Sequence, residues 1–114
     1  MGTKKPTIEP GFLPGALEML ILKTLSRGPN HGWGIAQRIQ LVSENALKVG
    51  EGSLYPALQR LLLDDCVEAE WGTSENNRRA RFYRITAKGR KRLAEEKRNF
   101  DFLLAGIARV MEAT

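Results

Sequence analysis

Apolar residues recur at spacings of three and four positions in two segments near the start of the chain, and this periodicity predicts two amphipathic helices. The first helix is expected over residues 13–26, with an apolar stripe made by Leu17, Leu20, Ile21 and Leu25. The Gly28-Pro29 pair that follows favours a turn and ends this helix. The second helix is expected over residues 32–43, with buried positions at Ile35, Ile39 and Val42. The short segment 46–49 is interpreted as a small edge strand.

A third apolar stripe indicates a helix that begins near residue 52. Gly52-Ser53 is a helix-start signal, because the Ser53 hydroxyl can accept a hydrogen bond from a backbone N–H of the first turn. Pro56 is expected in that first turn, where its missing N–H removes no intrahelical bond. The stripe itself consists of Leu54, Leu58, Leu61 and Leu62. The residues left on or near the exposed face are Tyr55, Gln59 and Arg60.

The pattern then changes from helical periodicity to strict alternation. Residues 67–71 and 81–85 both alternate apolar and polar side chains, as half-buried strands do, and we expect Trp71 in the core. Residues 72–77 between them contain Gly, Ser and Asn, which favour a turn. A helix followed by such a hairpin is typical of a winged helix, in which the helix fills a major groove of DNA and the hairpin contacts the phosphates beside it.

The last predicted element is a helix that is longer than so small a domain needs for its own core. Thr86 is a suitable N-cap, and the helix is expected to run to about Glu112, a length of about 39 Å. Its apolar stripe has spacings of three, four and seven, which resembles a coiled-coil seam. The positions of this stripe are Leu93, Phe100, Leu103, Leu104, Ile107, Val110 and Met111. An apolar face without a partner in its own chain must be buried elsewhere, so we expect a homodimer interface there.

Together these elements predict an α+β fold that is mainly α-helical, with a winged helix-turn-helix domain plus a long C-terminal dimerisation helix. Residues 1–12 are rich in Gly, Pro and Lys, and we expect them to form a flexible N-terminal arm. The winged-helix DNA-binding domain is expected over residues 13–86, and the C-terminal dimerisation helix over residues 87–114.

Four short motifs resemble those of the PadR family of transcriptional regulators. These motifs are Leu13-Pro14-Gly15, His31-Gly32-Trp33-Gly34, Glu51-Gly52-Ser53-Leu54-Tyr55-Pro56-Ala57-Leu58 and Arg81-Phe82-Tyr83-Arg84-Ile85-Thr86. The resemblance covers roughly residues 13–113, and the single C-terminal helix is similar to the small PadR subfamily. The resemblance implies a dimeric winged-helix repressor that binds double-stranded DNA at a palindromic operator.

The resemblance also implies roles for two aromatic residues. The position of Trp33 is usually a tyrosine near the DNA backbone, so Trp33 is a candidate DNA contact, and simple helix packing is an equal alternative. The position of Phe100 commonly carries a tryptophan that stacks on flat apolar ligands between the subunits. Phe100 is therefore the candidate binding site for a small aromatic inducer, and packing within the dimer seam is the alternative.

The basic residues of the chain are distributed unevenly. The formal net charge is +5, but residues 78–98 hold ten of the eighteen Lys and Arg residues and only two acidic ones. Such a concentration is expected of a surface that binds a polyanion. For residues 90–98 a solvated helix face is an equally good explanation. The candidate DNA-binding residues are Arg78, Arg79 and Arg81 on the hairpin, for phosphates, and Ser53, Tyr55, Gln59 and Arg60 on the helix that enters the groove.

Catalytic and metal chemistry is not indicated. The single histidine, His31, and the single cysteine, Cys66, lie 35 positions apart and have no partners for a metal site or a nucleophile–base pair. We interpret His31 as a capping or packing residue and Cys66 as a small buried hydrophobe. We therefore expect no enzyme activity, no cofactor and no metal. Because no apolar run is long enough for a membrane span or a signal peptide, the expected location is the cytoplasm.

Two other functions are compatible with the predicted fold. A winged-helix module that binds a protein instead of nucleic acid is one, although the basic segment and the polar exposed face of the third helix argue against it. A non-specific architectural DNA-binding protein is the other, and it would bind without sequence preference.

Overall fold

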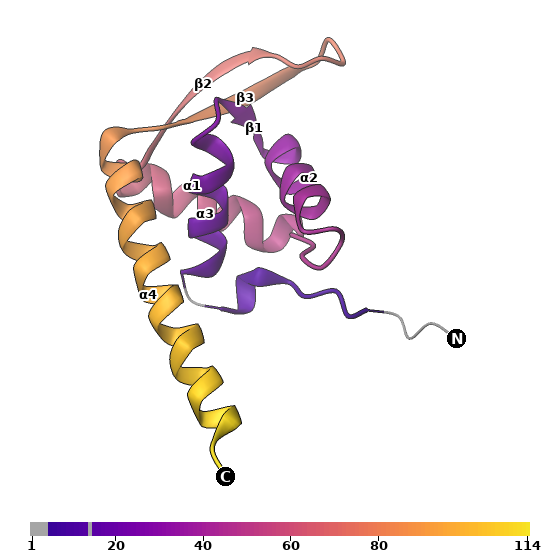
Figure 1. Ribbon diagram of the computed structural model, residues 1–114. Helices are drawn as coiled ribbons and strands as arrows, with labels where there is room; N and C mark the ends of the chain where they lie inside the picture. The colour runs from indigo at the N-terminus through magenta and orange to yellow at the C-terminus, as the bar shows by residue number, and fades with distance from the viewer. Residues whose placement is uncertain (1–4, 14) are drawn as a thin grey trace.

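The computed structural model describes residues 5–13 and 15–114, so residues 1–4 of the expected arm and Pro14 of the first motif lie outside the described residues. In chain order the elements are η1 (Pro10–Phe12), α1 (Ala16–Leu25), β1 (Asn30–His31), α2 (Gly32–Val42), α3 (Glu51–Leu63), β2 (Val67–Thr73), β3 (Arg79–Ile85) and α4 (Ala87–Glu112). Helices α1 to α3 form the body, the sheet lies across one end, and α4 runs along one side and past the body (Figure 1). The predicted α+β, mainly helical architecture is confirmed.

The core lies where α1, α2 and α3 meet. Its fully buried leucine and isoleucine side chains are Leu17, Ile21, Leu22, Leu25, Ile35, Leu54, Leu58 and Leu61. Most of the predicted stripe positions are therefore confirmed, but Leu22 is buried although no stripe included it, and Leu20 is only half-buried. The predicted burial of Val42 is wrong, because this side chain is 62% exposed. Val42 is the last residue of α2, and the chain turns away directly after it through Glu44 and Asn45 at positive φ angles of 54° and 68°.

The start of α3 also differs from the sequence prediction. The helix begins at Glu51 with Gly50 as its N-cap, so Ser53 is its third residue and not its cap. Because the helix starts earlier, Pro56 lies in the second turn, where its missing N–H leaves the Gly52 carbonyl without an intrahelical partner. The predicted apolar face is otherwise confirmed.

Part of the segment expected to be a free arm is tied to the body. The Glu9 carboxylate accepts the N–H of Gly50 at 2.7 Å, at the start of α3, where the helix dipole favours a negative charge. Ile8 donates its N–H to the carbonyl of Ala46 at 2.8 Å and accepts the N–H of Lys48 at 3.1 Å. The segment 46–49 therefore forms only an isolated bridge with this arm and not the predicted edge strand.

The sheet has three antiparallel strands in the order β1-β3-β2. The β2–β3 hairpin is confirmed and is longer than predicted, with register pairs from Val67 with Ile85 to Thr73 with Arg79. Strand β1 was not predicted, because two residues are too few for a periodic pattern. The prediction that Trp71 lies in the core is wrong, since its side chain is 61% exposed. Trp71 lies in the outer half of β2, four residues beyond Val67 at the buried base of the hairpin.

Helix α4 has 26 residues and begins as predicted. The Thr86 hydroxyl accepts the N–H of Gly89 at 3.0 Å and donates to the carbonyl of Asp65 at 2.7 Å. The first half of α4 lies against α1, and the second half extends past the body (Figure 1). Leu93 is half-buried and packs against the chain's own core, so it lies outside the freely exposed part of the stripe.

Candidate nucleic-acid interface

The base of the hairpin contains a buried tyrosine, Tyr83 on β3. The guanidinium of Arg81 lies 5.9 Å from the centre of the Tyr83 ring. Burial raises the pKa of Tyr83, Arg81 lowers it in part, and Tyr55 raises it further. The Tyr83 hydroxyl therefore stays protonated at neutral pH. Tyr83 pairs with Asn30 of β1 and Ala69 of β2, and the sequence pattern did not single it out as a site residue.

Tyr55 also contacts the beginning of α2. A Cβ atom added at Gly32 would lie 3.0 Å from a ring carbon of Tyr55 and 3.1 Å from its hydroxyl oxygen, so a larger residue at position 32 would push the tyrosine away. The Tyr55 side chain is nevertheless 48% exposed. Trp33, the residue after Gly32, is 56% exposed at the same end of α2. The structure therefore brings two of the predicted aromatic contacts to neighbouring positions on the surface.

The sole histidine caps α2 and also reaches the hairpin. Nδ1 of His31 accepts the N–H of Gly34 at 3.0 Å, so the proton of the neutral ring is on Nε2. That Nε2 lies 3.6 Å from Oε1 of Glu75 in the hairpin turn, and the ring meets Phe82 edge-on with centroids 5.4 Å apart. The predicted capping and packing role of His31 is confirmed. Its contact with the hairpin turn was not predicted from the sequence.

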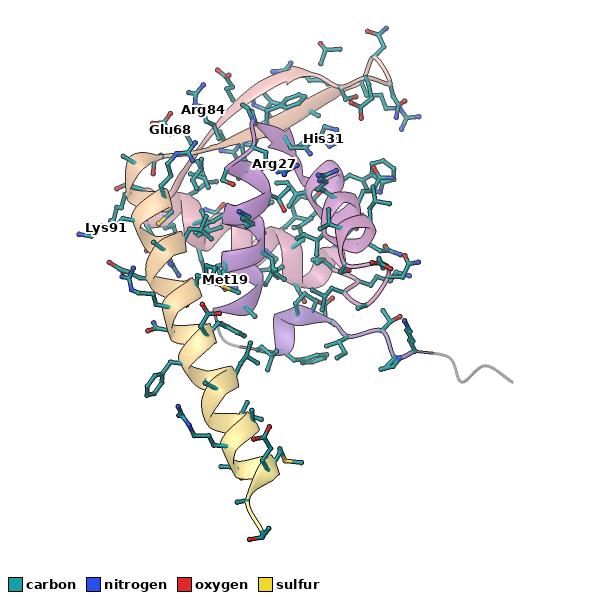
Figure 2. All side chains as sticks on the ribbon, in the orientation of Figure 1. Met19, Arg27, His31, Glu68, Arg84 and Lys91 are labelled. Atoms are coloured by element: carbon teal, nitrogen blue, oxygen red, sulfur yellow. The ribbon has the colours of Figure 1, made fainter. Side chains whose placement is uncertain are left out.

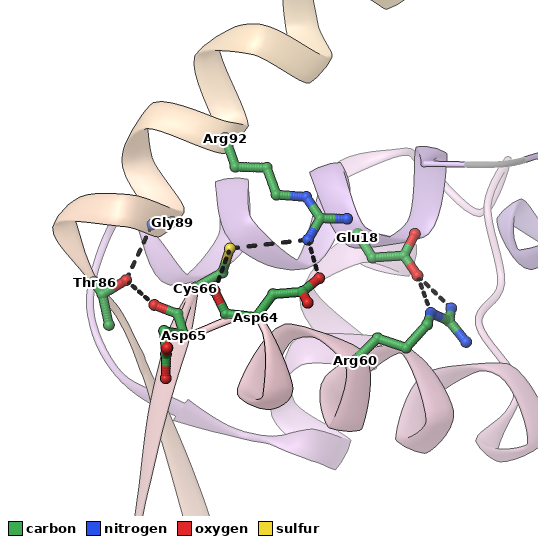
Figure 3. A network of polar contacts seen from close by, with 8 residues as sticks. All are labelled: Glu18, Arg60, Asp64, Asp65, Cys66, Thr86, Gly89 and Arg92. Carbon is green, nitrogen blue, oxygen red and sulfur yellow. Dashed lines mark hydrogen bonds and ion pairs between the residues drawn. The ribbon is translucent and has the colours of Figure 1, made fainter.

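Two of the predicted α3 residues are held by other parts of the chain. Nε of Arg60 donates to Oε1 of Glu18 at 2.9 Å, and the Glu18 side chain on α1 is only 8% exposed (Figure 3). Removing this guanidinium would leave a buried carboxylate without its partner, so Arg60 holds α3 on α1, while its own side chain remains 57% exposed. Ser53 is half-buried and lies against Gly11 of η1. Gln59 is exposed.

The two faces of the hairpin differ in charge because side chains alternate along each strand. One face pairs Arg84 with Glu68 at 3.0 Å and with Glu70 at 3.9 Å, which neutralises most of its positive charge (Figure 2). The other face carries Arg79 and Arg81, and no carboxylate ion-pairs with either of them among the residues that the structure describes. The positive charge of the hairpin strands is therefore concentrated on the face that carries Arg79 and Arg81. Arg78 is exposed next to the turn.

A second polar cluster fixes α4 to the end of α3. Arg92 donates to Oδ2 of Asp64 at 2.8 Å and lies 3.9 Å from Sγ of Cys66, whose side chain is buried as predicted (Figure 3). Lys97 pairs with Asp101 at 2.9 Å within α4. Part of the basic segment over residues 90–98 is therefore occupied by contacts within the chain.

The free part of the α4 stripe is exposed in the single chain. Phe100 is half-buried where the helix leaves the body, and the exposed fractions rise beyond it. They are 50% for Leu103, 56% for Leu104, 49% for Ile107, 74% for Val110 and 77% for Met111. Contiguous exposed apolar side chains of this extent mark an interaction surface.

Within residues 5–13 and 15–114, no group of three or more His, Cys, Asp and Glu side chains is arranged to hold a metal ion. Over the same residues, no helix combines the length and the apolar character that a bilayer span requires.

Comparisons with known proteins agree with this description. The model of a family described as "Transcriptional regulator PadR-like family" matches residues 21–95. "Uncharacterized protein X" of Lysinibacillus sphaericus is 30% identical over 84 residues, which cover 74% of this chain and 77% of that protein. A transcriptional regulator from Clostridium thermocellum has a TM-score of 0.78 at 24% identity, covering 86% of this chain and 95% of that one. A PadR-like transcriptional regulator from Bacillus cereus has a TM-score of 0.73 at 25% identity, covering 90% and 98%.

Proposed function

Because the chain belongs to the PadR-like family of transcriptional regulators, we propose that it is a repressor that binds a palindromic operator as a homodimer. One observation carries this proposal. Tyr55 in the exposed N-terminal half of α3 contacts Gly32 at the start of α2, and His31, the residue before Gly32, pairs with Phe82 of the hairpin, so a helix suited to a groove and a hairpin suited to phosphates lie next to one another. This role belongs in the compartment that holds the chromosome, so we place the protein in the cytoplasm.

In this proposal α3 enters the major groove of double-stranded DNA. Gln59 is the candidate for reading a base edge, because its amide can pair with adenine in two places. Tyr55, near the start of α3, and Trp33, near the start of α2, are exposed and have donors for phosphate oxygens. Arg78 and Arg81 contact the backbone beside the groove. Base contacts supply sequence preference, and phosphate contacts supply affinity and register.

The dimer follows from the free stripe of α4. A two-fold axis along this seam repeats α3 in the second subunit, and two helices related by such an axis recognise a palindrome. The apolar face that the single chain exposes from Leu103 to Met111 is then covered by its own copy.

Selection from a random duplex library tests the function as a whole. The purified protein is incubated with the library, bound duplexes are amplified, and the enriched sequences are compared. We expect a consensus with two inverted half-sites. An enriched pool without any consensus would instead indicate a non-specific DNA-binding protein, and no retention of DNA would favour a protein-binding module.

Substitutions on α3 and on the hairpin should affect binding in different ways. Gln59→Ala is expected to change the preference at one position of each half-site by about 1–3 kcal/mol. Arg81→Ala is expected to weaken binding to all duplexes alike and to reduce the slope of log affinity against log salt by about one. Arg84→Ala is the matched control, since Arg84 is paired with Glu68 on the opposite face and should leave the slope unchanged. Equal slopes for the Arg81 and Arg84 variants would exclude the hairpin as a phosphate clamp.

We further propose that a small aromatic inducer binds near Phe100, between the subunits. Phe100 lies where α4 leaves the body, one turn after Glu96, whose carboxylate lies beside Gly15 at the start of α1. A ligand there would act by binding more tightly to the DNA-free conformation of the dimer than to the DNA-bound conformation, and the two conformations would differ in the spacing of the two α3 helices. A differential of about 1–3 kcal/mol changes operator occupancy appreciably.

Titration of planar aromatic compounds into the protein–operator complex tests this site. We expect release from the wild type and weaker release from Phe100→Ala, measured by fluorescence anisotropy of labelled operator DNA. Equal release from both proteins would place the inducer elsewhere. Release from neither would leave Phe100 as a packing residue of the dimer seam.

A further inference from the structure

The hairpin carries an exposed tryptophan that the phosphate-binding role does not use. Trp71 is 61% exposed, and the guanidinium of Arg79 lies 4.8 Å from the centre of its ring. Trp71 pairs with Arg81 across the sheet, and Arg79 pairs with Thr73, so Arg79 reaches diagonally along the same face of the hairpin. The indole ring therefore packs against the Arg79 guanidinium, and the N–H groups at the edge of the guanidinium remain available to a ligand.

Contact with a phosphate does not account for this pair. A phosphate contact would use the charge of Arg79 and at most the indole N–H of Trp71, and it would leave the apolar carbon surface of the indole in water. The walls of a DNA minor groove, by contrast, are deoxyribose carbons against which an indole can pack. The negative potential of a narrow minor groove attracts a cation, and a guanidinium loses its water there more readily than an ammonium does.

The position of the pair fits the minor groove. Seven residues of β3 extend about 23 Å, so the hairpin reaches well beyond its buried end at Ile85. Figure 1 shows the hairpin projecting from the sheet past the helical body. With α3 in a major groove, a hairpin of this reach crosses the adjoining backbone, and the next groove along the duplex is a minor groove.

We propose that Arg79 enters the minor groove beside each half-site, that Trp71 positions it there, and that the protein consequently prefers A·T pairs at these flanking positions. The inference rests on the proposed function, because it needs an operator and a recognition helix in the major groove. A·T-rich DNA narrows the minor groove, whereas a G·C pair adds the guanine amino group to its floor. Arg79 thereby differs from Arg78 and Arg81, which contact phosphates.

The test uses duplexes that share the consensus core from the selection experiment and differ only in their flanks. Three flanks are compared: A·T, G·C and inosine·C, where inosine·C has the major-groove edge of G·C but lacks the minor-groove amino group. We expect wild-type protein to bind the A·T and inosine·C duplexes with similar affinity. It should bind the G·C duplex roughly five- to tenfold more weakly, a loss appropriate to one minor-groove contact.

Three variants assign the preference to residues. Arg79→Lys keeps the positive charge but replaces the planar, weakly hydrated guanidinium with an ammonium group. Trp71→Leu removes the indole ring against which the guanidinium packs. Both substitutions should reduce the preference for A·T over G·C flanks to less than about twofold. Arg78→Lys is the matched control and should keep the wild-type preference. Trp71 is exposed, so Trp71→Leu should leave the thermal unfolding temperature nearly unchanged, which is checked on the same samples.

The outcomes separate this inference from the function on which it rests. Equal affinity of the wild type for all three flanks, or a preference that survives Arg79→Lys, would overturn the minor-groove assignment while the consensus core stands. A preference for A·T that inosine·C does not restore would place the contact in the major groove and also overturn it. A selection that returns no consensus would overturn the proposed function itself.

Discussion

Ile107→Asp is expected to convert the protein from a dimer to a monomer and to lower its affinity for the operator by about 10²- to 10⁴-fold. Ile107 lies in the middle of the exposed stripe of α4, with Leu104 and Met111 on the same face. The two-fold symmetry of the proposed dimer places both new carboxylates in the seam, and burying each without a partner costs several kcal/mol. The loss of DNA affinity follows because each half-site is then bound independently, without the effective concentration that the dimer supplies.

Phe102→Asp is the matched control for this experiment. Phe102 is 81% exposed on α4, and its position, five residues before Ile107, puts it on a different side of the helix. Light scattering should show half the wild-type mass for Ile107→Asp and an unchanged mass for Phe102→Asp. An unchanged mass for Ile107→Asp, or a monomeric wild type at tens of micromolar, would mean that the stripe of α4 is covered by something other than a second copy.

The helices, the hairpin and their order were predictable because each has a periodic pattern that its burial imposes. Leu54, Leu58 and Leu61 are buried because α3 packs one face on the core, and that same periodicity is visible in the sequence. One error lies where a contact joins distant parts of the chain. The Glu9 carboxylate at the start of α3 acts across 41 positions, and no local pattern reveals it.

The candidate site was predictable in its elements but less so in its individual residues. The exposed position of Arg60 was predicted correctly from its spacing, but its ion pair with the buried Glu18 joins positions 42 residues apart on two helices, and no local pattern reveals it. Trp71 was assigned to the core because tryptophan is apolar and lies on the alternating face of β2. Its exposure depends on how far the helical body extends beneath the hairpin, which is a property of the packed structure.

Gly89→Ala is expected to destabilise the protein by about 2–4 kcal/mol, although alanine is the better helix former. A Cβ atom at this position would lie 2.1 Å from the carbonyl oxygen of Cys66 and 2.8 Å from Cγ1 of Ile85. The carbonyl belongs to the backbone that leads into β2, so the clash cannot be relieved by a side-chain rotation. Helix α4 must instead move away from the sheet. Because α4 carries the proposed dimer seam, this movement would also change the spacing of the two α3 helices.

Gly106→Ala in the same helix separates this clash from the general effect of replacing glycine. Apart from its chain neighbours and the backbone of its own helix, no atom of the described residues lies within 4 Å of a Cβ at position 106, so this substitution should stabilise the protein by up to about 1 kcal/mol. Both variants are compared with the wild type by urea unfolding at one protein concentration, because dimerisation contributes to the apparent stability. If Gly89→Ala were as stable as Gly106→Ala, α4 would not be held closely against Cys66. In a second measurement, the operator affinity of Gly89→Ala is determined at a temperature where this variant is fully folded. A reduced affinity at that temperature would show that the anchoring of α4 sets the geometry of DNA binding.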